Sequence, residues 1–180
     1  LIRGYVQGAT VLVTGAGGSI GSELCRQLAG FAPGQLLLLD ANEYNLHSLH
    51  MELTHELGFA ANTPLLGDLR DRAWTGRIFA EHAPKVVFHA AAYKHVPMLE
   101  TQPWQAVLNN VLGTEILLDT ALEHKAERVL LVSTDKAVKP ANVMGATKRL
   151  TELLMLERLN TSTRLMAVRF GNVVGSAGSV

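Results

Sequence analysis

Val11-Leu12-Val13-Thr14-Gly15-Ala16-Gly17-Gly18-Ser19-Ile20-Gly21-Ser22-Glu23-Leu24 is the stretch that decides the fold of this 180-residue chain. Its apolar first part has the length of a strand, and it stops at a cluster of glycines. Apolar residues then resume at Ile20, Leu24 and Leu28, with the spacing of a helix. The stretch therefore predicts a strand that turns directly into a helix.

The glycines in this turn have the spacing of a dinucleotide-binding loop. Gly15 allows the tight turn, Gly18 lets the backbone approach a pyrophosphate, and Gly21 lets the helix pack on the strand. The helix N-terminus favours an anion there, because its N–H groups are unpartnered and the positive end of the helix dipole lies at that point. We therefore predict that the three glycines, Ser19 and Ile20 bind a cofactor. The alternative is an ordinary turn with a helix cap.

An acidic residue follows the second predicted strand. Residues 36–39 are all leucine, and Asp40 follows them close to the spacing of about 20 residues that the dinucleotide fingerprint has. A carboxylate there suits the ribose hydroxyls of NAD and repels the 2′-phosphate of NADP. The alternative is that Asp40 is the N-cap of the helix that begins near Asn42.

The composition is that of a folded globular chain. Hydrophobic residues make up 48% and charged residues 18%, and the formal net charge of zero argues against nucleic acid as the main partner. No apolar run is long enough to cross a bilayer, and the N-terminus lacks the order of a signal peptide. The single cysteine, Cys25, excludes an intrachain disulfide and indicates a reduced compartment. We therefore expect a cytoplasmic chain that contacts neither nucleic acid nor membrane.

The remaining elements alternate between strand and helix. Strands are predicted at 10–13, 36–39, 64–67, 86–89, 129–132 and 165–169, and helices from the glycine turn to 29 and at 45–57, 68–83, 104–124 and 144–160, after a lead-in of residues 1–8. This alternation predicts an α/β fold with a doubly wound parallel sheet, which is the three-layer Rossmann architecture. The chain lacks an initial methionine and ends in a loop-like stretch. We expect residues 1–180 to be one dinucleotide-binding domain excised from a longer chain.

Ligands of such sheets bind at the carboxyl ends of the strands, so the residues that follow each strand are candidates for the site. After the third strand, Asp68 and Leu69 are placed to contact an adenine, with an N-cap as the alternative for Asp68. After the fourth strand, the small side chains of Ala90, Ala91 and Ala92 allow a flat cofactor to lie close to the backbone.

Two histidines flank these alanines. His89 and His95 lack a third ligand at a suitable spacing, so we predict no metal site. We interpret His89 as a core or strand-end histidine.

Polar side chains crowd the end of the fifth strand. Ser133, Thr134, Asp135 and Lys136 follow one another there, and such groups are costly to desolvate, which indicates a functional site. A solvated polar turn is the alternative. Lys148 lies one turn into the next predicted helix, on the face of Met144, and so returns toward the same place.

The chain resembles a known family at these residues: the extended short-chain dehydrogenases, and within them the nucleotide-sugar 4,6-dehydratases of polysaccharide biosynthesis, which serve capsule and lipopolysaccharide assembly. The cofactor loop 14–21, the central helix residues 110–114 and the segment 169–173 match the wider group. Residues 90–100 and 133–148 resemble the branch that dehydrates UDP-N-acetylglucosamine. The resemblance covers nearly the whole chain.

The resemblance implies a mechanism in which hydride leaves carbon 4 of the hexose for NAD or NADP and returns at carbon 6. In it, Lys136 removes the proton on carbon 5, and Asp135 assists the departure of the carbon 6 hydroxyl as water. This requires a lowered pKa for the lysine and a raised pKa for the aspartate. Lys148 holds the nicotinamide ribose and eases hydroxyl deprotonation. Thr134 and Ser133 hydrogen-bond the substrate.

One residue departs from the wider pattern. Most of the superfamily has tyrosine four residues before the active-site lysine, whereas this chain has Met144, which cannot relay a proton. Either the enzyme is inactive or the proton takes another route. Membrane-anchored members of the branch share the methionine, so we favour an active parent, which is the longer protein from which we expect this domain to come.

Three further residues are expected at the site. We predict Asn110 at the cofactor, with the alternative that it holds the helix backbone in place. Lys94 and Asn172 are predicted at the substrate.

Two rival functions remain open from the sequence. A 4-epimerase returns hydride to carbon 4 and needs no acid–base pair for eliminating water, so Asp135-Lys136 favours the dehydratase. A non-catalytic NAD(P)-binding module is the second rival. We expect the parent to be a homo-oligomer that acts on a UDP-sugar and is anchored to the inner membrane with this domain on the cytoplasmic side. The fragment alone is expected not to turn over, whether it binds cofactor poorly or well.

Overall fold

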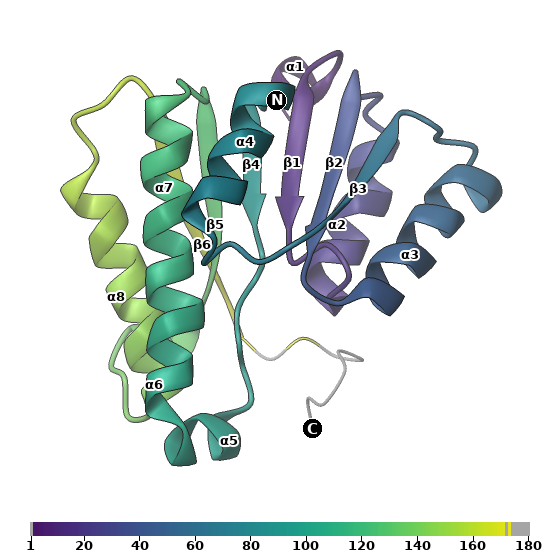
Figure 1. Cartoon of the computed structure of the whole chain (residues 1–180). Coiled ribbons are helices and arrows are strands. Elements are labelled where there is room, and N and C mark those ends of the chain that lie inside the picture. The colour runs from purple at the N-terminus through teal and green to yellow at the C-terminus, as the bar shows by residue number, and fades with distance from the viewer. Residues whose placement is uncertain (1, 172, 174–180) are drawn as a thin grey trace.

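The computed structural model describes residues 2–171 and 173 of the chain. Six parallel strands form one sheet in the order β3-β2-β1-β4-β5-β6, with helices on both faces (Figure 1). The strands are β1 Thr10–Thr14, β2 Gln35–Asp40, β3 Asn62–Leu66, β4 Val86–His89, β5 Arg128–Thr134 and β6 Arg164–Phe170. The predicted doubly wound α/β fold is therefore confirmed.

Alternation of side chains along the central strands divides the core into two layers. Val11 and Val13 of β1 pack on one face, beside Cys25, whereas Leu12 and Leu37 pack on the other. The first layer is covered by α2 and α3, and the second by α4, α7 and α8 (Figure 1). Because both faces are covered, the inner strands read as continuous apolar runs.

The helices connect the strands in the predicted order. Their bounds are α1 Arg3–Val6, α2 Ser19–Ala29, α3 Glu43–Met51, α4 Arg72–His82, α5 Val96–Thr101, α6 Pro103–Ala106, α7 Gly113–Glu123 and α8 Val143–Glu157. Side chains cap three of their N-termini: Asn42, Asp71 and Asn142 each accept a hydrogen bond from the backbone N–H three residues later.

The structure differs from the sequence prediction at the ends of several helices and strands. The 3.6-residue repeat of 45–57 and 104–124 continues through π-helical segments, Glu52–Glu56 and Val107–Leu112, so each predicted helix exists but changes its hydrogen bonding midway. Strand β3 starts two residues before Pro64, which is tolerated because β3 is an edge strand. Helices α1 and α5 were not expected, since four and six residues are too short to show a periodic pattern.

The sheet order reverses between β1 and β4, the two central strands that come from separate halves of the winding. The glycine turn after β1 and residues 90–95 after β4 consequently lie side by side at the switch point, where such sheets bind ligands. Helices α5 and α6 lie beyond the carboxyl ends of the strands, next to this point (Figure 1). Within the described residues, no helix combines the length and apolarity needed to span a bilayer.

Candidate functional site

The glycine turn is built so closely that larger residues do not fit. Gly15 has φ +68°, and a Cβ placed on it would lie 2.6 Å from the backbone nitrogen of Ala91. A Cβ on Gly21 would lie 1.9 Å from the carbonyl oxygen of Gly15. These contacts bring loop, helix and neighbouring strand together as the fingerprint requires, so the structure gives the predicted roles of Gly15 and Gly21 a physical basis.

Helix α2 starts at Ser19 without a side-chain cap, because its N-cap is Gly18. Ile20 and Gly21 of its first turn line the cavity described next. The positive end of the helix dipole therefore lies beside this cavity, as at an anion-binding helix end. Gly18 itself closes the turn through a 3.1 Å bond from its N–H to the Gly15 carbonyl.

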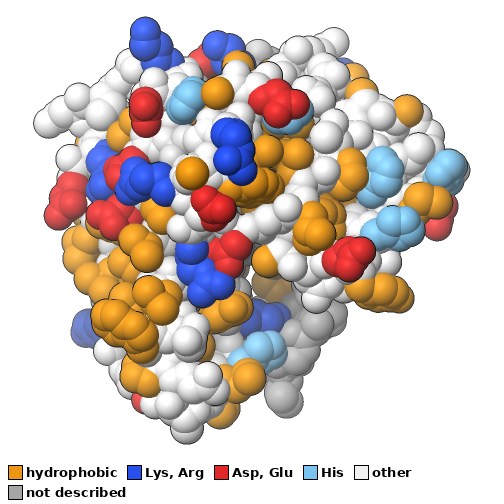
Figure 2. All heavy atoms as spheres, in the orientation of Figure 1, with side chains coloured by type: hydrophobic (Ala, Val, Ile, Leu, Met, Phe, Trp, Pro, Cys, Tyr) orange, Lys and Arg blue, Asp and Glu red, His pale blue; other side chains and the backbone are white. Residues whose placement is uncertain are grey.

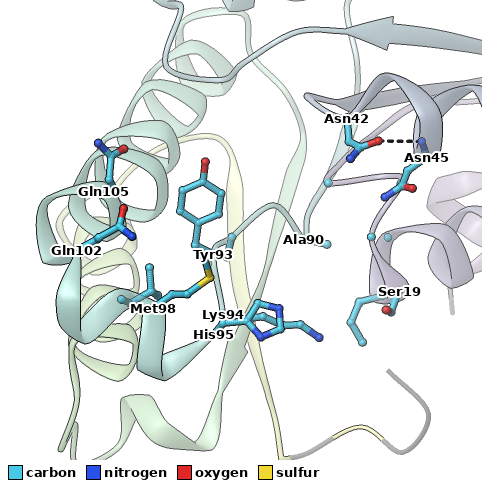
Figure 3. Close-up of a pocket in the computed structure, with 17 residues that line it drawn as sticks. Ser19, Asn42, Asn45, Ala90, Tyr93, Lys94, His95, Met98, Gln102 and Gln105 are labelled. Carbon is cyan, nitrogen blue, oxygen red and sulfur yellow. Dashed lines mark hydrogen bonds between the residues drawn. The ribbon is translucent and has the colours of Figure 1, made fainter. Parts of the chain in front are cut away.

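A cavity of about 790 Å³ opens over this turn. The predicted residues Ser19, Ile20, Ala90 and Ala92 line it together with the three glycines. Figure 3 shows Ser19 and Asn45 on one side and Tyr93, Met98, Gln102 and Gln105 on the other, with Lys94 and His95 between them. The volume suits a dinucleotide or sugar nucleotide. Gly15, Gly18 and Gly21 form a glycine cradle, in which the backbone borders the cavity without intervening side chains, and a Cβ at Gly15 or Gly21 would disrupt it. The residues present therefore fit an NAD-type cofactor.

Several lining residues were missed by the sequence prediction: Asn45, Tyr93, His95, Met98, Leu99, Gln102 and Gln105. Those on α5 and α6 reach the cavity only because these helices fold back beside the switch point. Tyr93 and His95 were visible beside Lys94, directly after a strand, and that position was the signal that could have identified them.

Asp40 is tied to the glycine turn. Its Oδ2 accepts a 2.8 Å hydrogen bond from the N–H of Gly17, and its Oδ1 accepts one of 2.8 Å from the N–H of Asn42. The N-cap of the next helix is Asn42, so the N-cap alternative for Asp40 is wrong. Asp40 lines a smaller cavity of about 300 Å³. Its contact with a ribose stays a prediction.

The same smaller cavity is lined by Asp68, Leu69 and Ala91. Asp68 forms an ion pair with Arg70, and this guanidinium holds the pKa of Asp68 below its usual range. The N-cap of α4 is Asp71, so the N-cap alternative for Asp68 is wrong as well. The position of Asp68 and Leu69 agrees with the prediction for an adenine, which stays a prediction.

Asn110 has a different place from the predicted one. It is only 1% exposed, its Oδ1 accepts a 2.7 Å bond from the N–H of Tyr93, and its Nδ2 donates to the Tyr93 carbonyl and to Thr147 Oγ1, at 3.0 Å each. Its hydrogen-bonding groups are thus occupied by protein. Asn110 fixes the loop after β4 against α8 and does not line the cavities described above.

His89 is a buried strand-end histidine, as predicted. Its Nδ1 lies 2.6 Å from Thr14 Oγ1 and its Nε2 lies 2.8 Å from Thr114 Oγ1. Thr114 donates its own proton to the Asn110 carbonyl, so Nε2 carries the histidine proton and Nδ1 accepts from Thr14. Burial lowers the pKa of His89 to about 3, with the charge of Lys148 as the second cause. The ring therefore stays neutral and links β1, β4 and α7.

A second cavity, of about 360 Å³, brings together the polar residues after β5 and the lysine of α8. Ser133, Thr134 and Lys136 line it with Met144 and Lys148, and Lys94 enters from the loop after β4. Ile20, Ala90 and Ala92 line both this cavity and the larger one. The predicted catalytic and cofactor residues are therefore adjacent.

Asp135 does not behave as predicted. β5 ends at Thr134, and the short 3₁₀ turn Asp135–Ala137 follows. This turn directs Lys136 into the cavity and leaves the Asp135 carboxylate 61% exposed, 3.5 Å from Lys136 Nζ. A hydrogen bond from Thr134 and the nearby Lys136 charge lower the pKa of Asp135. The expected raised pKa is therefore wrong here, because the carboxyl lies in water beside a cation.

Met144 lies in a small apolar cluster. It packs with Leu99 of α5 and Ala106 of α6, and it is 7% exposed while still bordering the second cavity. Lys148, one turn later, is 6% exposed, and burial lowers its pKa to about 8. Position 144 therefore anchors α5 on α8 and supplies no proton-transfer group.

Ser133 already has a protein partner. Its hydroxyl donates a 2.7 Å bond to Glu152 Oε1, which leaves only its oxygen lone pairs for a substrate. Asn172 lies outside the residues that the structure describes. Among residues 2–171 and 173, no three His, Cys, Asp or Glu side chains gather as a metal site would require.

Residues 11–180 match a protein family described as polysaccharide biosynthesis protein. The chain is 45% identical over 183 residues to the capsular polysaccharide biosynthesis protein CapD of Staphylococcus aureus. All of this chain is covered, but only 31% of that protein, so the chain spans about a third of the length of this curated relative.

Two solved structures resemble the fold. The Pen protein of Bacillus thuringiensis aligns with a TM-score of 0.89 and 32% identity, over 98% of this chain and 54% of that one. The UDP-glucose 4-epimerase of Brucella ovis, solved in complex with NAD, aligns with a TM-score of 0.78 and 25% identity, over 94% of this chain and 54% of that one.

Proposed function

Because the chain belongs to the polysaccharide biosynthesis protein family, we propose that it is the dinucleotide-binding domain of a longer nucleotide-sugar 4,6-dehydratase, here called the parent. The substrate is a UDP-N-acetylglucosamine-type sugar. The observation that carries the proposal is the second cavity, in which Thr134 and Lys136 meet Lys148 beside the glycine cradle. The likeness to a UDP-glucose 4-epimerase supports a reaction on a nucleotide sugar.

The residues of the cavity divide into groups that bind and groups that move protons. The bound nicotinamide supplies a transient hydride acceptor. Lys148, which lines the cavity and is only 6% exposed, holds its ribose. Lys136 lines the same cavity and, when neutral, removes the proton on carbon 5 of the keto sugar. Thr134 also lines this cavity and hydrogen-bonds the hydroxyl on carbon 4.

The elimination of water needs an acid, and Asp135 is the proposed one. In the structure its carboxylate is ionised and exposed, so it donates a proton only after its surroundings change. A bound sugar that covers Asp135 would remove water from the carboxyl and raise its pKa. The ionised state in the chain alone therefore belongs to the protein without substrate.

NAD is the proposed cofactor in preference to NADP. Asp40 is held by two backbone N–H groups at the edge of the smaller cavity, so its charge cannot turn away from a ligand there without breaking both bonds. A fixed carboxylate accepts hydrogen bonds from ribose hydroxyls and repels a 2′-phosphate.

A nucleotide-sugar 4-epimerase is the second candidate. It is favoured by the ionised, exposed Asp135, which an epimerase does not need as an acid, and by the likeness to the Brucella ovis structure. The two candidates share hydride transfer at carbon 4 and differ in whether water leaves from carbon 6.

The parent is proposed to be a homo-oligomer. Figure 2 shows hydrophobic side chains gathered over α7 and α8, and the large apolar residues exposed on α6 and α8 include Trp104, Leu150, Leu153 and Leu156. A second copy that packs its own α7 and α8 there would bury them as a four-helix interface. A parent that sediments only as a monomer would contradict this. Attachment of the parent to the inner membrane, with this domain on the cytoplasmic side, also stays a proposal.

The function is tested by incubating the parent with UDP-N-acetylglucosamine and NAD or NADP and measuring the product by mass spectrometry. We expect the sugar nucleotide to lose one water with no net reduction of cofactor. An unchanged mass with an inverted centre at carbon 4 would favour the epimerase. Lys136→Met is the matched variant, because it should abolish turnover and leave cofactor binding intact.

A further inference from the structure

Glu152 is a buried carboxylate that the proposed reaction does not use. It lies on α8, one turn after Lys148 on the same helix face, and is only 6% exposed. A carboxylate at such a depth is destabilising unless it is paired and hydrogen-bonded. Its partners therefore indicate what it does.

Four hydrogen bonds converge on this carboxylate from three elements. Ser133 of β5 donates to Oε1 at 2.7 Å, and Arg169 of β6 donates from Nε and Nη2 at 2.9 and 2.7 Å. Arg149 of α8 donates from Nη1 at 3.1 Å. The two-pronged bond to Arg169 fixes the plane of the carboxylate. These bonds join α8 to the ends of the two strands that border the second cavity.

Glu152 also supplies the negative charge that raises the pKa of Lys148. The charged and titratable groups that line the second cavity are Tyr93, Lys94, His95, Lys136 and Lys148, and no carboxylate is among the described residues that line it. His89 of β4, whose pKa is lowered by burial and by the charge of Lys148, stays neutral. The arginines that neutralise Glu152 have side chains about 40% exposed, so solvent screens their charges more than that of the buried carboxylate.

Two opposing effects set the pKa of Lys148. Burial disfavours the charged amino group, while the charge of Glu152 favours it. Because Met144 replaces the tyrosine found four residues before this lysine in most of the superfamily, no ionisable side chain at position 144 contributes. The charge of Lys148 consequently depends on Glu152.

We propose that Glu152 is a positioning residue of the second cavity, which locks α8 to the ends of β5 and β6 and keeps Lys148 in its cationic form at neutral pH. A cationic Lys148 donates hydrogen bonds and cannot act as a base. The inference rests on the proposed function only for the use of that charge, since the charge itself is a property of the chain without substrate.

The test measures the titration of Lys148 in the chain by competitive acetylation with peptide mass spectrometry. In Glu152→Gln, which keeps the shape and an acceptor for Ser133, we expect the midpoint of Lys148 to fall. Because the pKa of Lys148 starts at about 8, a fall of about one pH unit gives roughly fivefold faster acetylation at pH 7. Glu157→Gln is the control, because Glu157 is exposed on the same helix, and it should leave Lys148 unchanged.

The direction of the shift separates charge from structure. If Glu152→Gln merely loosened the fold, Lys148 would become solvated and its midpoint would rise toward that of free lysine. A rise, or an unchanged midpoint in a variant with a native circular dichroism spectrum, would overturn the proposal. If Glu152→Gln does not fold, Arg169→Gln takes its place. Once hydrogen exchange shows that α8 of this variant is protected as in the native chain, so that Lys148 has not become solvated, the midpoint of Lys148 should rise, because Glu152 is then less neutralised. An unchanged or lower midpoint would contradict us.

Discussion

The buried histidine at the end of β4 makes the stability of the chain depend on pH in a way that can be calculated. His89 is 2% exposed and bonded at both ring nitrogens, and its pKa in the folded chain is about 3 against an ordinary 6.5. The unfolded chain therefore binds a proton at a higher pH than the folded chain does. The contribution of the neutral ring is complete above pH 6.5 and is lost as the pH falls from 6.5 toward 3.

The magnitude follows from the two pKa values. Between pH 7.5 and 5 the protonation of the unfolded state alone removes about 2 kcal/mol from the free energy of unfolding. Replacing the ring by His89→Gln removes this titration. The variant is expected to be less stable at neutral pH, but it should lose about 2 kcal/mol less than the native chain on going to pH 5.

Urea denaturation followed by circular dichroism at both pH values measures this difference. Carboxylates titrate in both proteins and cancel in the comparison. His47→Asn, at an exposed position, is the control and should keep the native pH dependence. Equal losses of unfolding free energy in the native chain and in His89→Gln would refute the reasoning, because a ring that is charged in the folded state, or solvated, would produce that result.

Three further predictions concern the cradle, the cofactor and the helix packing. Gly21→Ala places a Cβ against the Gly15 carbonyl, so NAD binding measured by calorimetry should weaken by at least about tenfold, and unchanged affinity would contradict the close packing. Asp40→Ser should raise affinity for NADP relative to NAD by on the order of tenfold, measured as a ratio of Kd values, and an unaltered ratio would remove Asp40 from cofactor selection. Arg158→Met removes a two-pronged ion pair with Asp119 that links α8 to α7, and should cost roughly 1 kcal/mol of unfolding free energy in urea. A variant as stable as the native chain would show that this pair contributes nothing.

The fold was predictable because its signals are local and repeated. Short apolar runs such as 36–39, bounded by turn residues, are typical of strands buried on both faces. The glycine turn fixes how the first strand meets the first helix. Helix α5 could not be predicted in the same way. Its six residues include Pro97 and show no complete apolar repeat, and it is held by contacts with Met144 and by the bond from the Val143 N–H to Glu100, which are distant in sequence.

The site was predictable as a set of strand ends but not in its detailed geometry. The position of Lys136 in the cavity and of Asp135 in solvent depends on a 3₁₀ turn of three residues, for which the sequence carries no periodic signal. Asn110 was expected at the cofactor because it is polar in apolar surroundings. Its partner is the backbone of Tyr93, and a backbone partner 17 residues away leaves no trace in side-chain patterns.

The central claim is that the parent removes water from a nucleotide sugar by proton abstraction at carbon 5, and product analysis in deuterium oxide tests it most directly. The parent is incubated with UDP-N-acetylglucosamine and NAD in this solvent, and the product is examined by mass spectrometry and NMR. We expect a sugar that has lost one water and carries one solvent deuterium at carbon 5, because Lys136 exchanges its protons with solvent. A product of unchanged mass, inverted at carbon 4 and free of deuterium, would contradict the claim and establish the epimerase instead.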